Sequence, residues 1–350
     1  MKSSSHVKRV LLTGVSGFFG AHMLEHLLGS TNWEIVGVAS WQHKGSPERV
    51  EEVLSGNPEW KNRVTIITHD LNAPFTKRTK ERIGRINFII NAASDSHVDR
   101  SITDPVPFVQ NNVNIALNML EYARSICGEY SDGSRAPLEM FIQFSTDEVY
   151  GAAPKGVNHA EWETMLPSNP YSASKAAQEA IAISYWRTYD VPVVITNTMN
   201  MFGEMQDPEK YTAQLISKIN KGEEVTVHGT EQNIGSRYYL HARNCADAIL
   251  YLMLTHAPAV FSDSVDRPSR FNVVGDVEMD NLALAEMVAN FLGKPLIYKF
   301  EDFHKTRPGH DRRYALDGVK LKQLGWTAPL EFERSLQNYI EWTLKHPLWL

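Results

Sequence analysis

Three glycines, each three residues after the last, constrain the fold of this chain more than any other feature. Gly14, Gly17 and Gly20 follow a short apolar run at residues 9–12 and open a helix predicted over residues 20–28. Glycine lets the backbone turn tightly and approach a ligand closely, and a helix N-terminus offers free N–H groups to a pyrophosphate. A glycine-rich turn between a strand and a helix is typical of a dinucleotide-binding βαβ unit, although a plain glycine turn is the alternative interpretation.

The same alternation of short apolar runs and longer helical stretches continues to about residue 200. It predicts buried parallel strands covered by helices on both faces, which is an α/β fold with a Rossmann-type doubly wound sheet. We predict further strands at 34–38, 64–68, 88–91, 140–144 and 193–196, and helices at 108–126 and 172–189. Helix 244–254 and strand 271–274 could return to this sheet, and 128–137 reads as a surface loop.

Length and composition limit the classes of protein that fit. At about 150 residues per domain, 350 residues suggest two domains. The formal charge of -6 is unsuited to coating nucleic acid, and glycines and charged residues interrupt the most apolar early stretch, 10–28. Cys127 and Cys245 have no nearby Cys or His in ligand spacing, so they favour a reducing, cytoplasmic compartment. We therefore predict no nucleic-acid partner, no membrane segment and no metal site.

The choice between two dinucleotide cofactors is open at the second strand. An acidic residue that would bind the adenosine ribose is expected at the end of that strand, but the chain has Ser40 there. Without a carboxylate, Ser40 and Lys44 could tolerate a 2′-phosphate, so NAD is predicted and NADP is not excluded. Asp70 and Leu71 follow the third strand, where a carboxylate could bind the adenine amino group; a simple turn is the alternative.

Tyr171 and Lys175 form a second signal, because residues four apart share one face of a helix. A free tyrosine has a pKa near 10 and can act as a base at neutral pH only if a nearby cation stabilises the phenolate. Lys175 can supply that cation. A Tyr and a Lys at this spacing occur by chance in many helices. The pair indicates a catalytic site because the glycine turn lies upstream of it.

A third signal is the run Ser145-Thr146-Asp147-Glu148, directly after the strand predicted at 140–144. Ligands gather at the carboxyl ends of parallel strands, and two acids there can provide a general acid and a general base. Hydroxyl residues followed by acids also commonly cap helices. The position between the glycine turn and the Tyr-Lys pair favours catalysis here.

With these motifs in order, the sequence resembles the extended short-chain dehydrogenase/reductase family, and within it the nucleotide-sugar 4,6-dehydratases of the dTDP-glucose type. The likeness runs almost from end to end. It is carried by residues 91–102, by 144–151 with its Thr-Asp-Glu, by 168–175, by 197–200 with 207–210, and by 307–314 followed by 324–326. Epimerases of the same fold usually lack the paired acids.

The resemblance implies a redox-neutral elimination with an internally recycled cofactor. Tyr171 would remove the proton of the sugar 4-hydroxyl while C4 gives hydride to NAD⁺. Glu148 would then take the C5 proton and Asp147 would protonate the departing 6-hydroxyl. Finally, hydride would return to C6 and a proton would re-enter at C5. Thr146 would hydrogen-bond the 4-oxygen, and Lys175 would also bind the nicotinamide ribose.

The resemblance also implies two sets of binding residues. The cofactor would contact Gly14, Ser16, Gly17, Phe18, Phe19, Gly20, Ser40, Asp70, Leu71, Ala92, Ala93, Ser94, Asn112, Tyr171 and Lys175. The nucleotide sugar would contact Ser96, His97, Asn200, Lys210, Arg237, Asn272, Arg307 and His310. We expect residues 7–200 with 236–276 to form the NAD(P)-binding domain, and 201–235 with 277–345 a smaller α/β domain that binds the nucleotide sugar.

Departures from the family pattern cluster on the substrate side. Where relatives carry an Arg-Asp pair, this chain has Gly235-Ser236, so either Arg237 or Arg307 would grip the diphosphate. The nucleotide and the hexose are thus left open. The alternatives are an epimerase or decarboxylase of the same fold, or a catalytically silent dinucleotide-sensing protein. A homodimer through helices 108–126 and 172–189 is expected from the family likeness.

Overall fold

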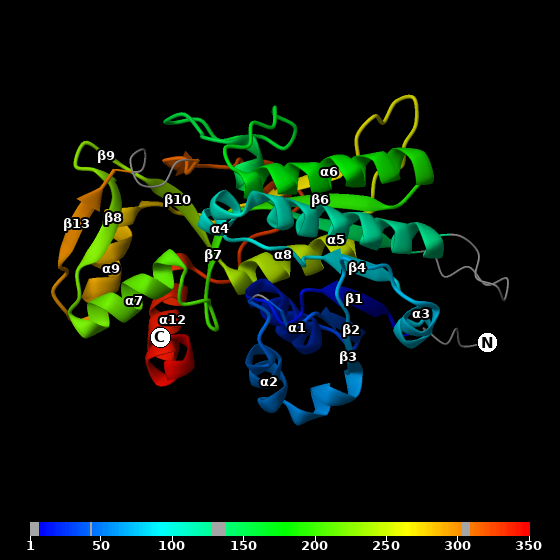
Figure 1. Ribbon diagram of the computed structural model, residues 1–350, viewed down its shortest axis with the longest axis horizontal. Helices are drawn as coiled ribbons and strands as arrows, with labels where there is room; N and C mark the ends of the chain where they lie inside the picture. Colours follow the sequence, from blue (N-terminus) through cyan, green and yellow to red (C-terminus); the bar gives the residue numbers. More distant parts are fainter. Residues whose placement is uncertain (1–6, 43, 128–137, 303–308) are drawn as a thin grey trace.

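The computed structural model describes residues 7–42, 44–127, 138–302 and 309–350, and its largest element is a parallel seven-stranded sheet. The strand order is β11-β6-β5-β4-β1-β2-β3. Strands β1 to β3 follow one another toward one edge of the sheet and β4 to β6 toward the other, so the order of strands reverses between the parallel neighbours β1 and β4 (Figure 1). The predicted Rossmann-type fold is confirmed. The strands are β1 Arg9–Thr13, β2 Glu34–Ala39, β3 Val64–Thr68, β4 Phe88–Asn91, β5 Met140–Thr146, β6 Val193–Thr198 and β11 Ser269–Val273.

Helices cover both faces of this sheet, as the continuous apolar strands require. One face carries α1 Phe18–Ser30, α2 Pro47–Ser55 and α8 Ala242–Thr255. The other carries α3 Lys77–Ile83, α4 Val98–Thr103, α5 Pro105–Ile126 and α6 Pro170–Tyr189, with α5 and α6 side by side (Figure 1). The short 3₁₀ helices η1 Pro58–Arg63 and η2 Asp147–Tyr150 lie in the connections.

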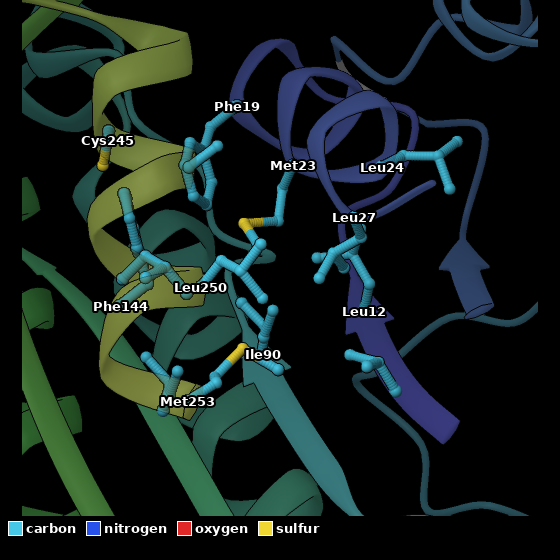
Figure 2. Packing of buried hydrophobic residues seen from close by; sticks show 14 of the residues in the cluster. Leu12, Phe19, Met23, Leu24, Leu27, Ile90, Phe144, Cys245, Leu250 and Met253 are labelled. Carbon is cyan, nitrogen blue, oxygen red and sulfur yellow. The ribbon is translucent and has the colours of Figure 1, made fainter. Parts of the chain in front are cut away.

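Alternate residues of each strand enter different cores. Leu12 and Ile90 pack with Phe19, Met23 and Leu250 on one side (Figure 2), whereas their strand neighbours point into the core under α5 and α6. Both sides are fully buried, which explains why these strands read as unbroken apolar runs rather than alternating ones.

Several boundaries differ from the predictions for local reasons. Helices α5 and α6 begin at Pro105 and Pro170, because proline suits the first turn of a helix, where its missing N–H is not needed. Strand β5 runs two residues further than predicted: Ser145 and Thr146 still pair with β6 through their backbones despite their polar side chains. Thr146 is therefore the last residue of a buried strand. The loop predicted at 128–137 lies outside the described residues.

A smaller part of the molecule lies beyond the carboxyl ends of the main strands. Its core is built from apolar residues of α7, α9 and α12, which surround small sheets (Figure 1). The elements are β7 Asn200–Phe202, α7 Tyr211–Lys221, β8 Val225–Thr230, β9 Asn233–Ile234, β10 Ser236–His241, β12 Glu278–Asp280, α9 Asn281–Leu292, β13 Tyr298–Glu301, β14 Arg313–Tyr314, α11 Val319–Gln323, α12 Phe332–Lys345 and η3 Pro347–Trp349.

The chain crosses between the two parts more than once. Strand β10 pairs with β7, β12 and β14 in the smaller part, whereas α8 packs on α1 and β11 joins the main sheet. The predicted domain boundaries stay a prediction. Within the described ranges, we find no helix with both the length and the apolar character of a membrane span.

Candidate active site

A large cavity opens at the carboxyl ends of the main strands. Its volume is about 1030 Å³, and the segments after β1, β2, β4, β5 and β6 line it together with the residues before α7. This is above the range of roughly 300–1,000 Å³ that is typical of sites for one small ligand. The position matches the rule that ligands bind where the strand order of an open sheet reverses.

The glycine turn forms one wall of this cavity and leaves no room for side chains. A Cβ on Gly20 would lie 2.0 Å from the carbonyl oxygen of Gly14, and one on Gly14, whose φ is +69°, would lie 3.0 Å from Cα of Ala93. Gly17 is the N-cap of α1 and provides no side-chain cap. The first N–H groups of α1 thus remain available to an anion in the cavity, as a pyrophosphate site requires.

The wall after β2 and β3 is held in a fixed shape. Ser46 N–H donates to the carbonyl of Ser16 over 3.0 Å, which ties the loop after β2 to the glycine turn. Ser40 Oγ accepts a hydrogen bond from Gln42 N–H. Asp70 lines the cavity and also accepts from Asn72 N–H at 2.9 Å, so the turn that was the alternative interpretation is formed as well.

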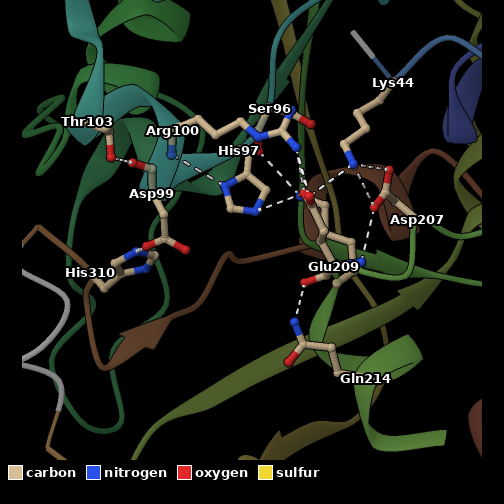
Figure 3. A network of polar contacts seen from close by, with 11 residues as sticks. Lys44, Ser96, His97, Asp99, Arg100, Thr103, Asp207, Glu209, Gln214 and His310 are labelled. Atoms are coloured by element: carbon tan, nitrogen blue, oxygen red, sulfur yellow. Dashed lines mark hydrogen bonds and ion pairs between the residues drawn. The ribbon is translucent and has the colours of Figure 1, made fainter. Parts of the chain in front are cut away.

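An ion cluster joins opposite walls of the cavity (Figure 3). Lys44 Nζ, from the loop after β2, lies 3.2 Å from Asp207 and 3.1 Å from Glu209, in the segment before α7. Glu209 also accepts from Arg100 at 2.8 Å and lies 3.3 Å from His97. Lys44 is therefore already engaged by two carboxylates, which reduces its capacity to bind a 2′-phosphate.

The acidic pair lies at the end of β5, where Thr146 organises it. Thr146 Oγ1 donates to Asp147 Oδ1 over 2.8 Å and accepts from Glu148 N–H at 3.3 Å, so it also caps η2. Glu148 Oε2 accepts from Asn169 at 3.3 Å and from the Tyr314 hydroxyl at 3.4 Å. Asp147 Oδ2 is buried and has no hydrogen-bond partner within the described part of the chain.

Burial changes the proton affinity of both acids. It raises the pKa of Asp147 to about 7, and the adjacent Glu148 charge acts in the same direction. Burial also raises the pKa of Glu148 above its ordinary value. A carboxyl group whose pKa lies near 7 can hold a proton at neutral pH and donate it, which suits Asp147 to general acid catalysis.

Tyr171 and Lys175 are both buried on α6. Asn169 caps this helix by accepting from Ser172 N–H at 2.9 Å, and Tyr171 lies in the first turn. Burial and then the Glu148 charge raise the pKa of Tyr171, whereas burial lowers the pKa of Lys175 to about 7. Lys175 Nζ donates to the carbonyl of Phe144 at 2.7 Å, so the ammonium is directed at the end of β5.

Most predicted site residues line the cavity together. Of the predicted catalytic and cofactor residues, only Asn112 does not. It is fully buried, accepts from Asp95 N–H and donates to Ser174, so it supports the loop after β4 from behind. The predicted substrate residues that line the cavity are Ser96, His97, Asn200 and Lys210.

Three other predicted substrate residues, Asn272, Arg237 and His310, do not line the cavity. Asn272 is fully buried and donates to the carbonyls of His159 and Asp317, because a polar residue inside β11 must satisfy its amide. The guanidinium of Arg237 donates hydrogen bonds to the carbonyls of Ser236, Asp311 and Arg312. Its Cζ lies 4.4 Å from the ring centre of Tyr314. His310 lies 2.8 Å from the Asp99 carboxylate. Arg307 is outside the described residues.

Sequence reasoning missed the groups that hold the acids in place. Asn169 and Tyr314, which contact Glu148, lie inside the motif stretches 168–175 and 307–314 but carried no assigned role. Their position in those motifs was the signal that could have identified them. The pairing of Lys44 with Asp207 joins residues 163 apart in sequence, and no local pattern indicates it.

Comparison with known proteins gives consistent matches over nearly the whole chain. The family model described as GDP-mannose 4,6 dehydratase matches residues 11–339. A probable dTDP-glucose 4,6-dehydratase of Sinorhizobium fredii is 33% identical, over 97% of this chain and 94% of the relative. A dTDP-glucose 4,6-dehydratase of Escherichia coli is 30% identical, over 98% and 94%.

Solved structures share the fold over nearly the whole chain. DesIV, a dTDP-glucose 4,6-dehydratase from Streptomyces venezuelae with NAD and TYD bound, superposes with a TM-score of 0.81 at 25% identity, over 97% of this chain and 98% of the other. The UDP-glucose 4-epimerase of Thermus thermophilus in complex with NAD gives a TM-score of 0.80 at 26% identity, over 97% and 99%.

Proposed function

The chain belongs to the GDP-mannose 4,6-dehydratase family, and we propose on that basis that it is an NAD-dependent lyase that removes water across C5 and C6 of a nucleotide-linked hexose. The product is the nucleotide-linked 4-keto-6-deoxyhexose. One observation carries the proposal: Asp147 and Glu148 lie side by side in the cavity that also contains Tyr171 and the glycine turn. Epimerisation needs no such acid pair, whereas loss of a hydroxyl needs a proton donor and removal of C5–H needs a base.

The cavity fits NAD. Side chains at Gly14 or Gly20 would fill the space beside the glycine turn, and the uncapped N–H groups of α1 can hold the pyrophosphate. Ser40, Asp70 and Leu71 line the end expected to hold the adenosine, and Ala92, Ala93 and Ser94 line the path toward Tyr171. Bound NAD supplies the acceptor for hydride from C4 and the donor that returns it to C6. Engagement of Lys44 by Asp207 and Glu209 favours NAD over NADP.

Tyr171 takes the proton of the sugar 4-hydroxyl in this proposal. Because burial and the Glu148 charge raise the pKa of its phenol, Tyr171 needs neighbouring positive charge to ionise. Lys175, one helical turn along, provides it in its protonated form. Thr146 lines the same cavity at the end of β5, and its hydroxyl, which donates to Asp147 without substrate, is placed to turn to the 4-oxygen when the sugar binds.

Glu148 and Asp147 then carry out the elimination. Oxidation at C4 acidifies the C5–H bond, and Glu148 removes that proton. Glu148 Oε2 is occupied by Asn169 and Tyr314, so Oε1 is the oxygen assigned to the C5 proton. Asp147, whose pKa of about 7 lets it retain a proton, gives that proton to the departing 6-hydroxyl. When hydride returns to C6, a proton re-enters at C5 and completes the 4-keto-6-deoxyhexose.

The remaining parts of the proposal concern substrate and assembly. Ser96, His97, Asn200 and Lys210 are the cavity residues proposed to contact the nucleotide sugar. A homodimer through α5 and α6, with a second copy completing a four-helix bundle, is proposed from the family likeness, and light scattering that gives a monomer mass would contradict it. A cytoplasmic location is proposed from the two separated cysteines.

A panel of hexoses that differ only in the nucleotide tests the proposal. The purified protein is incubated with dTDP-, UDP-, CDP- and GDP-linked glucose or mannose, and the masses of the products are measured by mass spectrometry. We expect one nucleotide to give a product lighter by one water, and Glu148→Gln to give none. A product of unchanged mass with inverted C4 would identify an epimerase. Loss of carbon dioxide from a nucleotide-linked uronic acid added to the panel would identify a decarboxylase. No reaction with any sugar would contradict the proposal.

A further inference from the structure

A buried ion pair lies behind the candidate active site, outside the cavity. Glu179 is on α6, one helical turn beyond Lys175, and Arg270 is on β11. Arg270 Nη2 lies 2.6 Å from Glu179 Oε2, and both side chains are at most 1% exposed. Removing two charges from water is costly, so such a pair is weak evidence for stability and calls for another explanation.

The second carboxylate oxygen of Glu179 reaches the end of β5. Glu179 Oε1 accepts hydrogen bonds from Ser145 Oγ and, at 2.7 Å, from Asn197 Nδ2. Asn197 Nδ2 also donates to the backbone carbonyl of Thr146 at 3.1 Å. Glu179 therefore connects α6 with both residues that immediately precede Asp147.

Arg270 reaches the other end of the same segment. Its Nη1 donates to the Tyr150 hydroxyl at 3.0 Å and to the Glu161 carbonyl at 3.1 Å, and its guanidinium lies 4.1 Å from the ring centre of Trp162. Tyr150 is the last residue of η2, the 3₁₀ turn that begins at Asp147. The ion pair thus holds the acidic turn from both sides.

We propose that Glu179 and Arg270 are positioning residues, which together set the place of residues 145–150, and so of Asp147 and Glu148, relative to Tyr171 and Lys175. Neither residue is itself part of the cavity lining. Glu179 acts through Ser145 and the backbone of Thr146, and Arg270 acts through Tyr150. The inference rests on the proposed dehydration for the reaction that these groups align.

The same carboxylate acts electrostatically on Lys175. Glu179 is the charged group that acts on Lys175. Tyr171, Asp147 and Glu148 line the same cavity as Lys175, and Arg270 on β11 is the ion-pair partner of Glu179. Burial lowers the pKa of Lys175, and the charge of Glu179 opposes that effect. Removing the charge should lower the pKa of Lys175 further, so that Lys175 loses its proton at a lower pH.

The test uses the full chain and three variants. Glu179→Gln and Arg270→Met each leave one buried charge unpaired, whereas the double variant removes both charges and keeps similar volumes. Glu224→Gln, which breaks the exposed pair with Lys299, is the matched control. For the double variant we expect a folded protein whose kcat falls about 10- to 100-fold, the effect of a displacement of up to 1 Å, with little change in KM.

The pH profile separates alignment from simple stability. In the double variant the alkaline limb of kcat should move to lower pH, while Glu224→Gln should keep the wild-type profile. A double variant with wild-type kcat and profile would overturn the proposal. If that variant does not fold, Arg270→Lys keeps the charge but not the contacts with Tyr150 and Glu161; a folded Arg270→Lys protein with wild-type kcat would overturn it equally.

Failure of the inference can be told from failure of the proposed function. If the wild type dehydrates no sugar in the panel, the proposed function fails. The effect of Glu179 on the pKa of Lys175 is then measured without substrate, by ¹⁵N NMR titration of the Lys175 ammonium in the free protein. A pKa lower in Glu179→Gln than in the wild type and in Glu224→Gln supports the coupling, and an unchanged pKa overturns it.

Discussion

Replacing Asp147 by asparagine should make the fold more stable at neutral pH while it removes the acid of the elimination. Burial, helped by the Glu148 charge, raises the pKa of Asp147 from 3.8 to about 7. Because Asp147 is 3% exposed, solvent screens this effect little. A rise of about three pH units corresponds to about 4 kcal/mol that ionisation costs the folded state.

The sign of the pH dependence follows from the raised pKa. Below the unfolded value of 3.8, the carboxyl group is protonated in both states and costs nothing. Between 3.8 and about 7 the unfolded chain ionises while the folded one holds its proton, so stability falls as pH rises. Asparagine has no such loss. Its buried amide N–H₂ carries a constant cost of about 1–3 kcal/mol if it lacks a partner, which lowers the gain without changing its pH dependence.

Urea unfolding from about pH 4 to about pH 8 measures this difference. The free energy of unfolding of Asp147→Asn minus that of the wild type should rise by up to about 4 kcal/mol across this range. With substrate, the variant should still oxidise C4, seen as NADH absorbance, but release no water. A difference that stays constant with pH would mean that Asp147 ionises as an ordinary surface acid, and the assignment of its proton to the leaving hydroxyl would be wrong.

Four further changes address the base for the 4-hydroxyl, the base for the C5 proton and the binding of the cofactor. Tyr171→Phe should abolish C4 oxidation, whereas Glu148→Gln should allow it and block elimination, so that NADH absorbance accumulates in single-turnover spectra. Gly20→Ala should abolish NAD binding in calorimetry, because its Cβ would lie 2.0 Å from a backbone oxygen of Gly14 that cannot move aside. Lys44→Met should speed NAD release by up to about fivefold, since partly exposed ion pairs contribute about 1 kcal/mol or less, and added salt should reduce the difference.

These changes have matched controls. Gly56→Ala places its Cβ where nothing lies within 4 Å, and it should leave NAD binding intact. Lys299→Met breaks an exposed pair with Glu224 and should not change NAD release. Full turnover by both Tyr171→Phe and Glu148→Gln would contradict their roles, and an unchanged release rate in Lys44→Met would show that the ion cluster does not retain the cofactor.

Local sequence patterns predicted the parts of the site that local geometry determines. The glycine turn, the acids after β5 and the Tyr171–Lys175 pair each lie on one element, and the parallel sheet brings the ends of those elements to one edge. Predicting the sheet therefore predicted their convergence. Strand β5 extends to Thr146 because backbone pairing with β6 continues past its apolar residues, which a hydrophobic pattern alone does not reveal.

The partners of polar side chains were harder to predict. Asn112 was predicted to contact the cofactor and Asn272 the substrate. Both instead donate hydrogen bonds to buried side-chain or backbone oxygens, because polar groups in a core need such partners. Arg237 likewise binds backbone carbonyls of the 311–312 segment. These pairings, like that of Lys44 with Asp207, join segments that are separate in sequence, so no local pattern indicates them.

The central claim is that one hexose meets Tyr171, Asp147 and Glu148 in a single cavity beside NAD. A nucleotide-linked hexose that carries deuterium at C4 tests it most directly. Mass spectrometry and NMR should find a product that has lost one water and carries the label in the new C6 methyl group, because hydride leaves and returns without exchange. Label that remains at C4, or that is lost to solvent while water is retained, would contradict the account.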